Sequence, residues 1–238
     1  MTPTWQVTLF ALVPVVAMAV AAVLATARPV AERVRSLLQH FAAGLVTAIV
    51  AVELLPDVHG TNPLWVVLGF AIGVAAMLGL RAFGLRLDER VEGTRSNAPL
   101  LTTVGIDLLI DGLLLGMAFT LGSSQGALLT LALTVEVLSL GTTVAAQLVT
   151  RGASRATAIT APIALSLLVT GGAVLGNTLL GGLSGPAYAI VISFGMAALL
   201  YLVVEELLVE AHEEEDTAVG VTAFFVGFIV LLLLSSLE

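Results

Sequence analysis

The stretch that decides the fold is residues 100–121, LLTTVGIDLLIDGLLLGMAFTL, an apolar run with two aspartates and no basic residue. A helix needs ~20 residues to cross about 30 Å of hydrocarbon, and this run has that length. Asp107 and Asp111 are four residues apart and therefore share one helical face. We interpret the stretch as a transmembrane helix that carries two carboxylates inside the membrane.

Similar apolar runs make up most of the chain. Apolar residues account for 58% of the 238 residues and charged residues for only 11%, too few to cover the surface of a soluble domain. We therefore predict an all-α integral membrane protein, a single transporter domain over residues 1–238. Its eight transmembrane helices are expected at about residues 5–27, 37–57, 63–84, 100–121, 126–149, 157–180, 186–208 and 218–237.

Several other classes of protein are excluded by the sequence. The absence of cysteine rules out disulfides and thiolate metal sites, and the net charge of −8 argues against nucleic acid as a partner. No hydrolase or nucleotide-binding motif occurs, so we expect no enzyme and no cofactor. The first apolar run lacks a preceding basic residue and is followed by Arg28, the reverse of a cleaved signal peptide, so we expect it to be retained.

The basic residues predict the orientation. All nine are arginines, and each lies in or beside the first, third or fifth connection: Arg28, Arg33, Arg35, Arg81, Arg86, Arg90, Arg95, Arg151 and Arg155. If these connections are cytoplasmic, the positive-inside rule is satisfied and both termini lie outside the cell membrane. The seventh connection is on the same side but acidic, and we interpret it as a solvated loop (Glu210, His212, Glu213, Glu214, Glu215, Asp216).

A short sequence repeat suggests internal symmetry. Residues 53–57, ELLPD, close the second predicted span, and residues 206–210, ELLVE, close the seventh. The two segments leave the membrane on opposite sides, as inverted repeats do in secondary transporters.

Glu136 is a third acidic residue deep in an apolar run, at a depth similar to that of Asp111 but reached from the opposite side. An unpaired carboxylate at the membrane centre costs at least about 2.5–3.5 kcal/mol. No Lys or Arg occurs in any predicted span core, so protons, a bound cation or water must compensate. Asp107, Asp111 and Glu136 are therefore candidates for a shared site, with a bound metal ion as one form of compensation. The alternative is three separately protonated acids that hydrogen-bond between helices.

Polar residues on two later helices could line a pathway to these acids. Ser139, Thr143 and Gln147 lie on or beside the Glu136 face, and the sixth span contains Ser166, Thr170 and Asn177. Each of them taken singly is more typical of helix packing than of ion binding. Small-residue stripes at Gly69/Gly73 and Gly112/Gly116 predict close helix contacts.

Several of these segments resemble the ZIP family of divalent metal (zinc/iron) transporters. Residues 41–44, FAAG, with residues 53–56, ELLP, resemble its second helix, and residues 201–211 resemble its seventh. Asp107, Asp111 and Gly112 fit the fourth-helix pattern His-Asn-x-x-Asp/Glu-Gly, and Glu136 fits a fifth-helix ligand. The resemblance implies eight helices, an inverted 3+2+3 repeat, and a metal site on the fourth and fifth helices.

The site departs from the family pattern and is degenerate by that standard. Asp107 stands where histidine is usual, and other ligand positions hold Leu108, Val137, Leu140 and Thr170, while Ser139 replaces a proline. Zinc sites favour histidine and thiolate, whereas all-oxygen sites suit magnesium, manganese or calcium. The sequence thus predicts a cation site without resolving zinc, manganese, iron or magnesium. Weaker candidates for cation contact are Glu53, Ser139, Thr170 and Glu206.

The predicted function is transport of a divalent metal ion as substrate across the lipid bilayer. Two alternatives remain open at this point: a ZIP-related protein that has lost metal transport and carries protons through the same carboxylates, and a non-transporting membrane scaffold. The oligomeric state, a homodimer included, and the energy coupling are also open.

Overall fold

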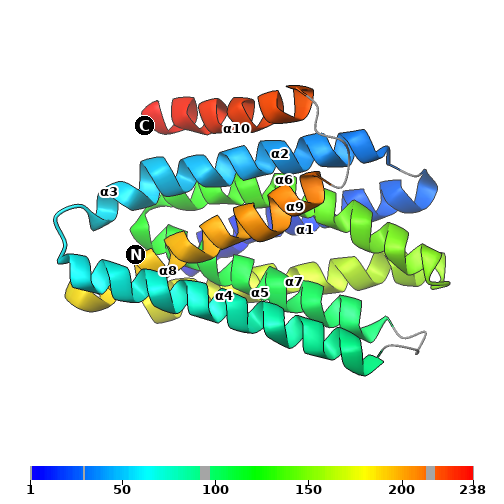
Figure 1. Ribbon diagram of the computed structural model, residues 1–238, viewed down its shortest axis with the longest axis horizontal. Helices are drawn as coiled ribbons and strands as arrows, with labels where there is room; N and C mark the ends of the chain where they lie inside the picture. Colours follow the sequence, from blue (N-terminus) through cyan, green and yellow to red (C-terminus); the bar gives the residue numbers. More distant parts are fainter. Residues whose placement is uncertain (1, 29, 92–96, 213–217, 238) are drawn as a thin grey trace.

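A computed structural model describes residues 2–28, 30–91, 97–212 and 218–237, without the side chains of residues 84, 85, 87–91 and 210 (Figure 1). Every element within these ranges is helical, and eight helices are long and apolar enough to cross a membrane. The elements are α1 (Thr4–Ala27), α2 (Glu32–Ala48), η1 (Ile49–Leu54), α3 (Leu55–Val58), α4 (Pro63–Val91), α5 (Ala98–Leu121), α6 (Ser123–Thr150), α7 (Arg155–Leu180), α8 (Gly185–Leu202), η2 (Val203–Leu207), α9 (Leu208–Ala211) and α10 (Ala218–Ser236).

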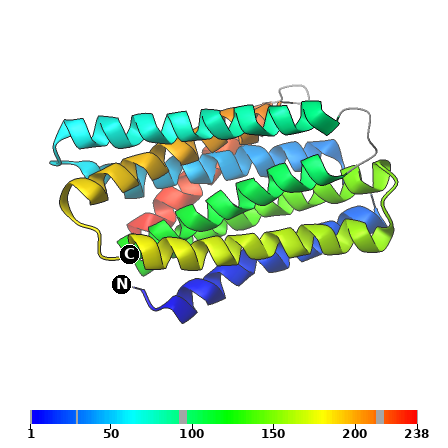
Figure 2. The ribbon, with the colours of Figure 1, turned by 90° about the horizontal axis from the view of Figure 1, so that it is seen from below.

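The long helices lie side by side along the longest axis of the molecule (Figures 1 and 2). Both chain ends lie at one end of the bundle, beside α3, as an even number of crossings requires. The described arginines gather toward the opposite end, where α1, α4 and α6 finish and α2 and α7 begin. We call this the arginine end.

The prediction of eight apolar spans in an all-helical chain is confirmed for the described residues. The largest shift in a boundary concerns the second span, which begins at Glu32 instead of residue 37. Its first two turns carry Arg33 and Arg35 and fall outside an apolar window, yet they continue the same helix. The α4 helix likewise extends to Val91, beyond its apolar segment.

Close glycine contacts hold the helices together in pairs. A Cβ atom at Gly112 of α5 would lie 2.3 Å from the Val169 carbonyl oxygen of α7, and one at Gly69 of α4 would lie 2.3 Å from the Ile190 oxygen of α8. Gly44 of α2 meets α10 in the same way. The prediction that the glycine stripes mark close packing is confirmed, since only a residue without a side chain allows such approach.

Two helices widen into π-helical turns before they end, a feature that the sequence analysis did not predict. The α2 helix continues into η1, which contains Glu53, and the α8 helix continues into η2, which contains Glu205 and Glu206. Pro56 follows η1, and its ring would clash with the carbonyl group four residues earlier in a regular α-helix. No proline follows η2. Single π turns occur often at functional sites.

Candidate metal centre

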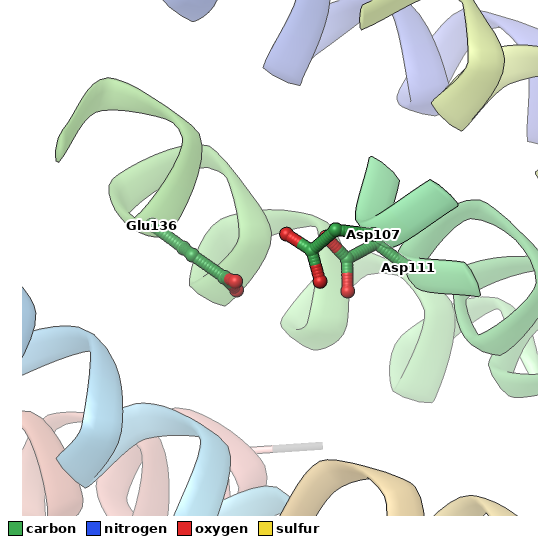
Figure 3. A group of neighbouring side chains, drawn as sticks. All are labelled: Asp107, Asp111 and Glu136. Atoms are coloured by element: carbon green, nitrogen blue, oxygen red, sulfur yellow. The ribbon is translucent and has the colours of Figure 1, made fainter. Parts of the chain in front are cut away.

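Three carboxylates converge in the middle of the bundle. Asp107 and Asp111 on α5 and Glu136 on α6 each offer an oxygen atom, and these atoms all lie within 4.8 Å of one another. Figure 3 shows the Glu136 side chain extended from its helix toward the two aspartates. Two oxygens on opposite sides of one ion lie about 4.0–4.2 Å apart around Mg²⁺ and about 4.6–5.2 Å apart around Ca²⁺. The spread of the carboxylates therefore matches the coordination sphere of one hard cation.

The packing of α5 explains why its aspartates face α6. Gly112 and Gly116 bring α5 against the backbone of α7 at Val169 and Ala173. Asp107 and Asp111 share a different face of α5, because adjacent residues in a helix point about 100° apart. Since α5 also packs on α6, that face is turned toward Glu136.

Among the three carboxylates, the charge of Asp111 is the least compensated by its surroundings. Its side chain is 1% exposed, and neither carboxylate oxygen has a hydrogen-bond partner among the described residues. Glu136 is 5% exposed and faces the same space. A buried charge without partners is strongly destabilising, so a protein that retains Asp111 beside two further carboxylates needs a ligand or protons there.

Glu206 adds a fourth carboxylate to the centre. Its side chain is hydrogen-bonded to Asp107, and its charge also acts on Asp111. A cavity of about 40 Å³ is bounded by Asp107, Glu136 and Glu206 together with Gln39, Ser139, Leu140 and Leu207. That volume is close to the ~30 Å³ occupied by one water molecule in the liquid, so the space suits a single small ion or water.

A larger cavity of about 460 Å³ connects this centre with the arginine end. Asp107 and Glu206 border it beside the centre, while Arg81 of α4 and Arg151, directly after the end of α6, line it toward the arginine end. The remaining lining residues come mainly from α4, α5, α6 and α8: Met77, Leu80, Leu100, Thr103, Val104, Ile106, Leu140, Thr143, Val144, Gln147, Tyr201 and Glu205. The centre is therefore approached from one end of the bundle.

The opposite half of α6 is closed. Gln125, Glu136 and Gln147 follow at intervals of eleven residues, about three helical turns, so they share one face. Between Glu136 and Gln147 this face borders the large cavity, whereas between Gln125 and Glu136 it carries buried apolar residues such as Leu129 and Leu133. At the closed end the Gln125 side-chain amide donates to Glu53 Oε2 at 3.0 Å.

The structure separates the weaker candidates into two groups. Glu206 and Ser139 border the small cavity, and Thr143 and Gln147 line the large one. Glu53 lies toward the closed end, where Gln125 contacts it.

The polar residues expected to line a pathway on the sixth span do not lie at the centre. Thr170 donates a hydrogen bond to the Ala11 carbonyl of α1, and Asn177 donates to the Thr2 carbonyl. Ser166 bonds within its own helix, to the Ile163 carbonyl. None of the three borders either cavity. The helical face of Thr170 packs on α1, so its expected contact with the cation gains no support from this arrangement and stays a prediction.

Two residues at the site were missed by sequence reasoning. Gln39 of α2 borders the small cavity. It lies just inside the predicted second span, and the sequence analysis gave it no role, although an amide side chain in an apolar run is a recognisable signal. Arg81 was assigned to a connection, yet it lines the large cavity and its guanidinium is paired with Glu205. Arg81 pairs with Glu205, and no pairing of Arg81 with Asp107, Asp111 or Glu136 is found among the described residues.

Two sequence-based predictions lie outside the described residues. The acidic connection includes residues 213–216, and one of the orienting arginines is Arg95. Both remain predictions.

Compared with protein-family models and with curated proteins, the chain matches none. The ZIP resemblance thus rests on the residues quoted above.

Proposed function

We propose that this protein is a ZIP-like transporter that carries a divalent cation across the membrane through the site between α5 and α6. The observation that carries the proposal is the buried Asp111 carboxylate, which lacks hydrogen-bond partners while two further carboxylates lie within 4.8 Å. A divalent cation would supply the missing compensation in a region where water and basic groups are scarce. A donor set of oxygens alone favours manganese or magnesium over zinc.

The packing pattern supports an inverted 3+2+3 repeat. Helix α4 packs on α8 as α10 packs on α2, and α7 packs on α5 as α1 packs on α6. A two-fold axis that exchanges α1 with α7, α2 with α8, α4 with α10 and α5 with α6 would map each of these contacts onto the other. Under the same exchange η1 corresponds to η2. In transporters with such repeats the substrate site lies between the halves, near the membrane midplane.

We propose that the protein lies in the cell membrane with its arginine end facing the cytoplasm, as the positive-inside rule predicts. The cavity of about 460 Å³ would then be the cytoplasmic release path. A reporter fused after Arg90 should accordingly be cytoplasmic, and one near His59 should be external.

Purified protein in detergent and in liposomes would test the function. We expect thermal stabilisation by manganese or magnesium, and uptake of the metal into liposomes, to be abolished by Asp111→Asn and by Glu136→Gln. Glu32→Gln is the matched control, because Glu32 is an exposed carboxylate at the start of α2 and should leave both readouts unchanged. Absence of binding and uptake in the wild type for manganese, magnesium, zinc and iron would overturn the proposal.

The Asp107–Glu206 contact favours one alternative function. A hydrogen bond between two carboxyl groups requires a proton on one of them, so this centre can hold protons as well as metal. A proton pathway would acidify the liposome lumen in the absence of any divalent metal, and added metal would block it or have no effect. Recording internal pH together with internal metal separates the two functions. A non-transporting scaffold would produce neither change.

A further inference from the structure

We propose that Arg81 is a positioning residue that, by holding Glu205, lets only one of two adjacent glutamates reach the cation site. This inference rests on the proposed transport function and concerns how many carboxylates the site presents. It starts from the ion pair between the Arg81 guanidinium and Glu205 Oε2, which joins α4 to η2 inside the cavity of about 460 Å³.

The two adjacent glutamates of η2 have different partners. Glu206 is hydrogen-bonded to Asp107 and borders the small cavity, whereas Glu205 is paired with Arg81 and borders only the large one. Neighbouring residues in a helix point in directions about 100° apart, so both cannot face the same group at once. The rotation of η2 turns Glu206 toward Asp107 of α5, and Arg81 holds the Glu205 side chain on the α4 side.

The Arg81 side chain is well placed to hold this arrangement. Gly69 and Gly73 fix α4 against the backbone of α8, the helix that continues into η2. Arg81 lies two turns beyond Gly73 on the same α4 helix, and Met77 between them is buried. The ion pair thus bridges two helices that are already rigidly packed, which limits the freedom of the Glu205 side chain.

The electrostatic consequence concerns release of the cation. The charged groups of the large cavity are Asp107, Glu205, Glu206, Arg81 and Arg151. With Arg81 in place, the charge of the Glu205 carboxylate is partly compensated. Without it, Glu205 becomes an additional free carboxylate on the path between the site and the arginine end. A departing cation would then be held longer, because more negative charge lines its way out.

Single substitutions should therefore act in opposite directions. Arg81→Gln is expected to lower both the KM and the maximal rate of metal uptake by about two- to fivefold, the range set by exposed ion pairs. Glu205→Gln leaves Arg81 unpaired beside the exit, so the KM should rise by a similar factor. If the ion pair only stabilised the fold, both substitutions would instead lower metal uptake in the same way.

Paired variants and a charge control complete the experiment. The double variant Arg81→Gln/Glu205→Gln and the charge swap Arg81→Glu/Glu205→Arg should both return the KM to about the wild-type value, since interacting residues are not additive. Arg151→Gln removes the same charge from the same cavity, where no ion pair is found for it among the described residues. It should therefore change the KM less than Arg81→Gln does.

The assay is manganese uptake into liposomes with wild type and Asp111→Asn measured alongside, and with thermal melting as a check on folding. Asp111-dependent uptake in the wild type, combined with KM shifts of the same sign in both single variants or none in either, would overturn the inference and leave the function standing. Lack of Asp111-dependent uptake in the wild type would overturn the function and the inference with it. Opposite shifts that cancel in the double variant are the expected result.

Discussion

The two π-helical turns have related sequences and face opposite ends of the bundle, yet their surroundings differ. In η2 the Glu206 side chain meets Asp107 at the edge of the cation centre, with a cavity leading to the arginine end. In η1 the Glu53 side chain is held by Gln125, and the α6 face between Gln125 and Glu136 is packed with apolar side chains. Among the described residues, a cavity thus leads from the centre toward the arginine end, whereas the α6 face toward the other end is filled by apolar side chains.

Under the proposed transport function, this asymmetry is what alternating access would require. If the two halves form an inverted repeat in different conformations, exchanging those conformations would open the packed end and close the other.

The largest expected difference is in access from water. The chain contains no cysteine, so a single introduced cysteine reports on one position. Thr143→Cys lies in the large cavity and should react with a water-soluble thiol reagent, whereas Leu133→Cys, on the sealed half of α6, should not react. Equal labelling of both positions would contradict a one-sided opening.

The next effect is on cation affinity. Glu206→Gln removes one negative charge from the centre but keeps a side chain that can bond Asp107, so divalent cation binding should weaken by roughly tenfold. Glu53→Gln is the matched change in the other π turn and should leave the affinity within about twofold. Both values follow from titration of the purified variants with manganese. A larger loss for Glu53→Gln than for Glu206→Gln would reverse the assignment of the two turns.

The acidity of the medium should also distinguish a carboxylate centre from other kinds of site. Carboxylates bind metal only when deprotonated, so lowering the pH should weaken manganese binding and slow metal uptake. The measurement is the affinity at a series of pH values, with Asp111→Asn as the reference that lacks a key ligand. Binding that strengthens as pH falls would rule out the three carboxylates as ligands.

The two halves should be alike in packing even though their sites differ. Gly44→Ala and Gly69→Ala each force a Cβ atom to within about 2 Å of a backbone carbonyl oxygen on α10 and α8 respectively. Each should destabilise the protein by about 1–3 kcal/mol. Gly79→Ala is the control, since a Cβ atom there meets no atom within 4 Å. Thermal melting of the three variants measures the effect.

The smallest expected effect is at the closed end. Gln125→Ala removes the hydrogen bond to Glu53, a contact between α6 and η1 that is worth about 1 kcal/mol. The closed end should open more readily, so Leu133→Cys should gain measurable labelling in the Gln125→Ala background. Thr143→Cys labelling serves as the internal reference. No gain at Leu133→Cys would mean that the apolar packing alone seals this end.

Much of the fold was predictable because membrane insertion constrains sequence strongly. The eight apolar spans could be located within a few residues from length and composition, and Asp107, Asp111 and Glu136 stood out because charged groups are rare in such runs. The position of Thr170 on the face toward α1 was not predictable, for a geometric reason. A hydroxyl group in a membrane helix bonds equally well to a carbonyl of a neighbouring helix, and the sequence does not tell which neighbour that is.

The sequence by itself determined the number of spans, the connections that carry the arginines, and the set of three acids. Each of these depends on residue type and on spacing along the chain. The tertiary structure alone decided that Glu206 joins the three acids, that Glu205 is held by Arg81, and that the large cavity runs toward the arginine end. These features depend on the widening of two helices into π turns and on the rotation of η2 relative to α4 and α5. Both are set by side-chain packing between helices far apart in the chain, which no local pattern encodes.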